Sequence, residues 1–148
     1  MSGGVELDMD VMKALRWLAE TTTDPQGFSV RLEIAQGNYI KETSKKVNFG
    51  APFDKSWYGD DVVAGFFSQA KSLIDNRRAF EISTASQIIP WVKQLGQNVK
   101  ILNQISGAKE RAKRMLDSTS VYPDTALFEL ILAGNYAAMG YEVEFIPE

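Results

Sequence analysis

The chain of 148 residues contains no cysteine and no histidine. Without cysteine it cannot form a disulfide or supply a thiolate nucleophile, and without histidine it has no imidazole base. These absences exclude Ser-His catalytic triads and Cys/His zinc sites. Any chemistry must therefore come from carboxylates, lysine, tyrosine, serine or threonine.

Long apolar runs are missing as well. The longest stretch without a charged residue, 130–141, has 12 residues, whereas a helix needs about 20 apolar residues to cross a bilayer. The first residues, MSGGVELDMD, lack the basic region and apolar stretch of a secretory signal. We therefore expect a cytoplasmic protein with no membrane-spanning segment.

The composition that remains is typical of a folded protein. Hydrophobic residues make up 45% of the chain, charged residues 24%, and the formal net charge is -3, which excludes the disordered class. A chain of this length buries roughly 70% of the surface that its unfolded form exposes, enough for one core. The patterns below predict a mainly α, mixed α+β fold with four or five helices and one or two short strands.

Apolar spacing predicts the helices. The clearest begins at Asp60 and Asp61, carries a broad apolar stripe and ends near Arg77 and Arg78, where the helix dipole favours cations. Another is expected over 86–105, with Pro90 either in its first turn or at a kink. The predicted core consists of these apolar side chains: Phe66, Phe67, Leu73, Ile74, Trp91, Leu95, Leu102, Leu127, Leu130 and Ile131.

Residues 28–34, FSVRLEI, alternate between apolar and polar side chains as a half-buried strand does. A short helix is the open alternative, since Arg, Leu and Glu all propagate helices. If 28–34 is a strand, its expected partner is 141–146, because an isolated strand leaves backbone groups unpaired. The following segment, 36–59, is irregular and predicts a long loop with aromatic anchors.

The C-terminal residues combine a helix, a glycine and a strand. Apolar spacing predicts a helix from Pro123, Gly140 suits the left-handed turn after a helix, and 141–146 alternates as a strand does. This separates the chain into a mainly helical domain, 1–121, and a helix-strand unit packed on it, 122–148.

Charge is unevenly distributed along the chain. The segment 71–114 has nine basic and three acidic residues, a net charge of +6, whereas 124–148 has five acidic residues and no basic one. A segment this basic can follow a phosphate backbone, with salt-dependent affinity, or it can be a solvated helical face. Its densest part contributes the candidate nucleic-acid-binding residues Lys109, Arg111, Lys113 and Arg114.

Two acidic features are candidate ligands for a cation. Glu129 lies in a predicted helix that is apolar nearly all round, so it either reaches the rim of the core and pairs with Lys or Arg, or it faces a metal or phosphate. Glu142 and Glu144 share one face of the predicted last strand, where they are either solvent-exposed or able to hold a hard cation such as Mg²⁺.

The segment YPDTALFELILAGNYAAMGYEVEFI, 122–146, resembles the opening helix and first strand of PD-(D/E)xK, restriction-endonuclease-like proteins. In that family the helix often carries a Glu, and the next strands bring an Asp and an acid-x-Lys triplet that hold Mg²⁺. The resemblance implies that Glu129 is the metal-facing Glu. It covers about one sixth of the chain, which has no counterpart of the catalytic Asp or the triplet.

We therefore expect a chain truncated before the catalytic strands, without catalysis or a cofactor of its own, and Mg²⁺ only if a nuclease core is completed. Two functions remain open. The chain is either the N-terminal helical region of a nuclease-like protein that binds DNA or RNA through 71–114, or a non-enzymatic module that binds a protein through the aromatic-rich segment 49–58.

Overall fold

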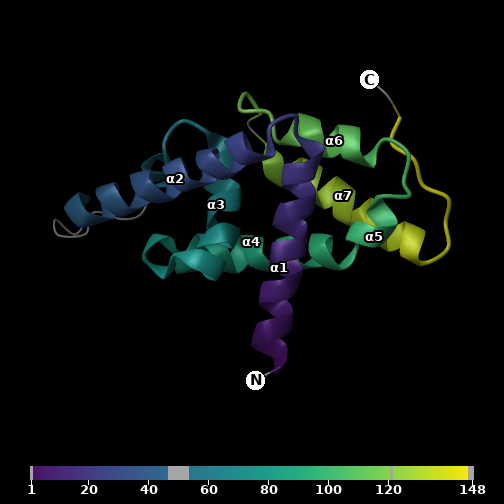
Figure 1. Cartoon of the computed structure of the whole chain (residues 1–148), viewed down its shortest axis with the longest axis horizontal. Coiled ribbons are helices and arrows are strands. Elements are labelled where there is room, and N and C mark those ends of the chain that lie inside the picture. Colours follow the sequence, from purple (N-terminus) through teal and green to yellow (C-terminus); the bar gives the residue numbers. More distant parts are fainter. Residues whose placement is uncertain (1, 47–53, 121, 147–148) are drawn as a thin grey trace.

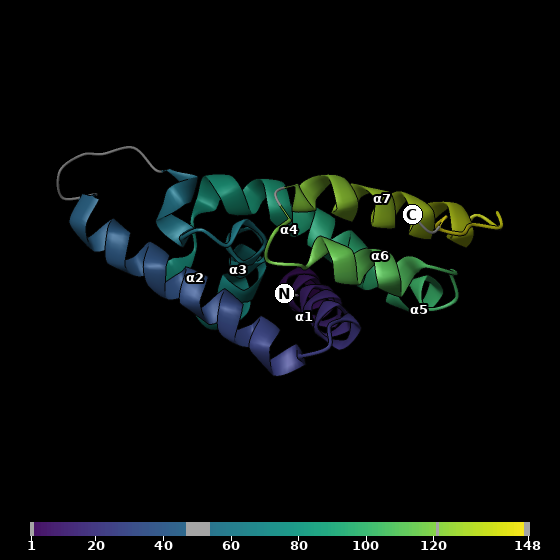
Figure 2. The same ribbon diagram turned by 90° about the horizontal axis from the view of Figure 1, so that it is seen from above.

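The computed structural model describes residues 2–46, 54–120 and 122–146. Within these ranges the chain forms seven α-helices and two short 3-10 helices, and it contains no strand. Figure 1 shows α1 crossing the other helices, with α2 and α3 on one side of it and α5, α6 and α7 on the other. Seen from above, α2 lies along one edge, and α4 and α7 along the opposite edge (Figure 2). The mixed α+β prediction is therefore wrong.

Helix α1, Ser2–Thr21, crosses α4, Ile82–Gln97, and packs against it at the centre of the molecule. Its apolar face, which includes Val11, Trp17 and Leu18, is buried. The two backbones come close at Gly96, where an added Cβ would lie 1.8 Å from the carbonyl oxygen of Asp10. Glycine is thus required here because a side chain would push α1 away from α4.

Helix α2, Pro25–Lys46, contains the segment that the alternation had assigned to a strand. The Asp24 side chain accepts a hydrogen bond from the Gly27 N–H at 2.9 Å, and Pro25 occupies the first helical position, a strong start signal. Phe28 and Leu32 are buried, whereas Val30 and Ile34 are exposed. Burial therefore follows the helical period, and the strand predicted at 28–34, with its pairing to 141–146, is wrong.

The segment 36–59, predicted as a loop, is helical over much of its length. Helix α2 continues to Lys46, and the 3-10 helix η2, Lys55–Tyr58, precedes α3. Phe49 and Phe53 lie outside the described residues. The predicted loop is therefore helical over 36–46 and 55–58, and Gly37 lies inside α2 without ending it.

Helix α3, Val62–Asp75, confirms the helix predicted from Asp60 and Asp61, and the 3-10 helix η3, Arg77–Ala79, connects it to α4. A buried amide fixes this connection. Gln69 donates to the Ala79 carbonyl at 2.9 Å and accepts from the Glu81 N–H at 2.7 Å. Without these two hydrogen bonds, the backbone groups of the turn would be buried with no partner.

The helix predicted over 86–105 is two helices, α4 and α5, Val99–Leu102, separated at Asn98. Pro90 is exposed inside α4. Helix α6, Ala108–Met115, and helix α7, Pro123–Ala138, complete the fold, and α7 packs against α4, α5 and α6. The described chain thus has more helices than the four or five predicted.

The strand predicted at 141–146 is wrong too. This segment forms a single parallel bridge, between Glu144 and Ser106. Its apolar alternation is present, but a strand also needs a continuous ladder of hydrogen bonds to a neighbour, and 28–34, its expected neighbour, is helical.

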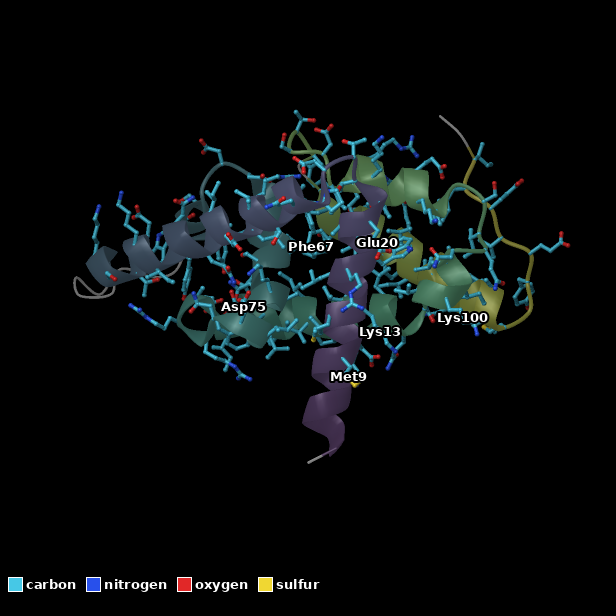
Figure 3. All side chains as sticks on the ribbon, viewed as in Figure 1. Met9, Lys13, Glu20, Phe67, Asp75 and Lys100 are labelled. Atoms are coloured by element: carbon cyan, nitrogen blue, oxygen red, sulfur yellow. The ribbon has the colours of Figure 1, made fainter. Side chains whose placement is uncertain are left out.

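One hydrophobic core extends across the described helices, including α7. Of the ten residues predicted to form it, six are buried, and Phe66, Leu73 and Trp91 are partly buried. Ile74 is exposed. Phe67, on α3, is among the largest fully buried side chains and lies near the middle of the molecule (Figure 3).

Candidate functional site

The basic residues predicted to bind nucleic acid lie on α6. Lys109, Lys113 and Arg114 are exposed, while Ala108, Ala112 and Met115 are buried against the core. Arg111 is different, since its Nε donates to Glu129 Oε2 at 2.9 Å. The helix thus places three of the four cations on an outer face and uses the fourth to contact α7.

Glu129 lies at the rim of the core on α7. Its side chain is 44% exposed and pairs with Arg111, which corresponds to the first of the two interpretations drawn from the sequence. Among the described residues, no group of three or more acidic side chains is placed to hold a metal ion. The structure therefore places Glu129 beside the cation of Arg111.

The wider basic segment, 71–114, extends across the molecule. Figure 3 places Asp75, which forms an ion pair with Lys71, to the left of α1, and Lys100 to the right of it. Lys71 and Lys100, both in this segment, therefore lie on opposite sides of α1.

The aromatic segment predicted to bind a protein is partly in the core. Trp57 and Tyr58 are buried, and both rings lie against Tyr39 of α2, with the Tyr39 and Tyr58 centroids 5.4 Å apart. Burial raises the pKa of the Tyr58 hydroxyl far above its usual range. These rings attach η2 to α2 and are not presented on the surface.

A groove opens next to this segment. It has a volume of about 770 Å³, and its walls come from η2, α3, α4 and the start of α7. Apolar groups along it include Val62, Phe66, Ile88 and Trp91, and polar groups include Ser83, Thr84 and Gln87 of α4. A concave surface with an apolar lining and a few polar groups is the usual form of a binding site.

An aromatic ridge, defined here as Trp91, Tyr122 and Phe128, borders the groove. The Trp91 and Phe128 rings lie 5.4 Å apart, and Trp91 and Tyr122 also line the groove. Tyr122 is 72% exposed and Phe128 is 46% exposed. Because large aromatic side chains are enriched where proteins bind one another, this cluster makes the surface a candidate interaction site.

Asp61 fixes the geometry of one wall of the groove. It accepts from Arg31 of α2 at 2.6 Å and 3.0 Å, and from the Ala64 N–H at 3.0 Å, which caps α3. Burial alone would raise the pKa of Asp61, but the hydrogen bonds from Arg31 and Ala64 outweigh it and hold that pKa below its usual value. Asp61 is therefore an ionised anchor between α2 and α3.

The charge around the groove is mainly acidic. Asp61 and Asp124 belong to its lining, and Asp54 and Asp60 adjoin lining residues in the sequence. Glu81 accepts from the N–H of Thr84, which also lines the groove. The bases are Lys55 in the lining and Arg31, which neutralises Asp61. A ligand that carries positive charge would be attracted to this rim.

Sequence reasoning did not find the groove, because its residues come from four elements between Lys55 and Asp124. The available signal was the cluster of aromatic residues at 57–66, 91 and 122–128, whose convergence depends on how the helices pack.

Within the described residues, no helix has the length and apolar character that crossing a membrane requires.

These features define a small all-helical domain with an aromatic-bordered groove on its surface. Comparisons with protein-family models, curated proteins and solved structures find no match for this chain.

Proposed function

We propose that this chain is a non-enzymatic protein-binding module whose groove holds a segment of a partner protein that is apolar at its centre and basic at its flanks. The observation that carries the proposal is the exposed aromatic ridge on an open apolar groove. Aromatic side chains supply much of the binding energy at protein interfaces, and a groove lets them surround a partner side chain.

Electrostatics favours a basic partner. The acids at the rim of the groove outnumber the bases, as described above. Charges of this kind speed the encounter with a complementary partner and reject partners of like charge. Ser83, Thr84 and Gln87 can exchange hydrogen bonds with the backbone of a bound segment.

The test uses a phage-displayed library of random peptides, selected on the purified protein. We expect the selected peptides to combine a large apolar residue with Lys or Arg. Gln87→Arg places a cation in the lining of the groove and should weaken their binding about tenfold or more. Gln94→Arg is the matched control, because it makes the same change on an exposed face two turns further along α4, outside the lining.

Peptides that bind wild type and Gln87→Arg equally well would show that the groove is not the binding surface. A selection that returns only acidic peptides would refute the charge argument. Both substitutions replace exposed glutamines inside a helix with a good helix former, so neither should disturb the fold.

A second candidate function, contact with DNA or RNA, is supported by the exposed cations of α6. Lys109 and Lys113 are one helical turn apart on its outer face, and Arg114 is exposed beside them. Such a face can neutralise phosphates without reading bases, with an affinity that falls steeply as salt is added.

This candidate is tested with fluorescently labelled duplex DNA and single-stranded RNA at low salt, read by anisotropy. Lys109→Glu/Lys113→Glu should abolish binding. Lys41→Glu/Lys45→Glu is the matched control, because it reverses two exposed lysines at the same spacing on α2, at the other end of the molecule (Figure 1). Equal losses in both variants would indicate a non-specific charge effect.

A further inference from the structure

The segment 141–146 leaves the end of α7 and is attached alongside the loop before α6. The Phe145 N–H donates to the Ser106 carbonyl at 2.8 Å, and Ser106 and Glu144 form a parallel bridge. Gly107, at φ 83°, lets the two backbones approach, since an added Cβ would lie 2.8 Å from the Phe145 carbonyl oxygen. The segment is therefore held at a defined place and register.

Its side chains alternate between two faces. Val143 and Phe145 pack against the core, whereas Glu142, Glu144 and Ile146 are exposed. This is the two-sided pattern of a strand, although the pairing seen in the described residues is limited to one bridge.

The bridge leaves one backbone edge open. In this parallel bridge, the backbone groups that face Ser106 belong to the residues on either side of Glu144. The N–H and C=O groups of Glu144 itself therefore point away from Ser106. Glu144 is exposed, and within the described part of the chain no hydrogen bond to its backbone groups is seen. An exposed edge of this kind is a template for another strand.

We propose that 141–146 is a strand-addition site that binds an extended segment of another protein carrying Lys or Arg at alternate positions. Main-chain hydrogen bonds to the open edge provide the attachment, and the side chains set the specificity. Glu142 and Glu144 lie on the exposed face, so basic residues of an added strand would stand opposite them.

Pairing with a second copy of this chain is disfavoured by the same residues. In an antiparallel self-pairing centred on Val143, Glu142 of each copy would face Glu144 of the other. Like charges directly opposite one another destabilise a sheet. The occupant is therefore a basic strand and not another copy of this segment.

The experiment uses the full chain, labelled with ¹⁵N, and two capped synthetic octapeptides. One alternates Lys with Val and the other alternates Glu with Val. We expect the Lys peptide to bind, to shift the amide signals of 142–146 and to slow hydrogen exchange at Glu144. The Glu peptide should bind at least tenfold more weakly, and Glu142→Lys/Glu144→Lys should reverse this preference.

A pair of variants at Glu144 separates backbone pairing from charge. Glu144→Gln removes the charge and keeps the outward N–H, whereas Glu144→Pro removes both. We expect the Pro variant to bind the Lys peptide several-fold more weakly than the Gln variant does. Continued exchange protection of the Phe145 amide, which donates to Ser106, would show that the Pro variant keeps the segment in place.

Equal binding by the Gln and Pro variants would overturn the proposal, because the backbone edge would then take no part. Equal binding of the Lys peptide to wild type and Glu142→Lys/Glu144→Lys would overturn it as well. None of these substitutions touches the lining of the groove. The two proposals can therefore fail separately.

Discussion

Replacing Asp61 with alanine should destabilise the fold by about 2–3 kcal/mol. Two interactions disappear together. The N-cap of α3, where Asp61 accepts from the Ala64 N–H, contributes about 1 kcal/mol. The paired contact with Arg31 contributes roughly 1–2 kcal/mol, since these charge-assisted bonds are strong but both side chains remain about a quarter exposed to screening water.

Two further variants separate these contributions. Asp61→Asn keeps a side-chain oxygen for the cap and loses the charge, so it should cost about 1–2 kcal/mol, the part that Arg31 contributes. Asp60→Ala, at the exposed neighbouring position, is the control and should change stability by less than about 0.5 kcal/mol. The assay is urea unfolding at pH 7, followed by circular dichroism at 222 nm.

The pH dependence provides an independent check. Because the folded pKa of Asp61 lies below its unfolded value, its charge stabilises the fold at pH values above the unfolded pKa, and this contribution is lost as the pH falls through the folded pKa. The stability deficit of Asp61→Asn should therefore shrink as the pH falls from about 5 towards about 2. The reasoning is refuted if Asp61→Ala costs no more than Asp60→Ala, or if the Asn deficit is unchanged at low pH.

Three more substitutions test the packing. Gly96→Ala should destabilise the fold by roughly 2 kcal/mol or more, because the added methyl would clash with the Asp10 carbonyl. The loss would appear as a lower urea midpoint, and an unchanged midpoint would contradict the α1–α4 contact. Phe67→Ala should cost about 3–5 kcal/mol in the same assay, since the ring is fully buried. Glu129→Gln should lower the stability of the fold by less than about 1 kcal/mol, because the ion pair of Glu129 with Arg111 is partly exposed. The difference from wild type should shrink in 1 M salt. A large loss of stability would show that Glu129 does more than pair with Arg111.

The parts of the fold that sequence patterns predicted well are those with a local cause. Helix α3 was found because its apolar stripe and its cap, Asp61, lie within one stretch of chain. Six of the ten predicted core residues are buried for the same reason, since helical spacing identifies an apolar face before its neighbour is known.

The two strands were predicted wrongly for different reasons. In 28–34 the alternation of apolar residues looked like a strand, while the start signal at Asp24 and Pro25 and the spacing of Phe28 and Leu32 indicate a helix. In 141–146 the alternation was real and is visible in the burial of Val143 and Phe145. A strand also requires a neighbour, which local pattern cannot supply.

The candidate sites divide in the same way. The outer cations of α6 could be read from the sequence, because Lys109, Lys113 and the intervening buried Ala112 follow the helical period. Pairing of Glu129 with a Lys or Arg was one of two alternatives, and the packing of α6 on α7 makes Arg111 its partner. The groove could not be found, because Tyr58, Trp91 and Tyr122 are distant in the chain.

By itself, the sequence determined which chemistries are excluded, which segments carry an apolar face and where the charges lie along the chain. Those properties depend on residue type and local spacing alone. The tertiary structure decided that Trp57 and Tyr58 are core residues while Tyr122 and Phe128 are exposed, and that the basic segment extends to both sides of α1. The physical reason is that burial and proximity depend on which helices pack together, and packing is a property of the whole chain.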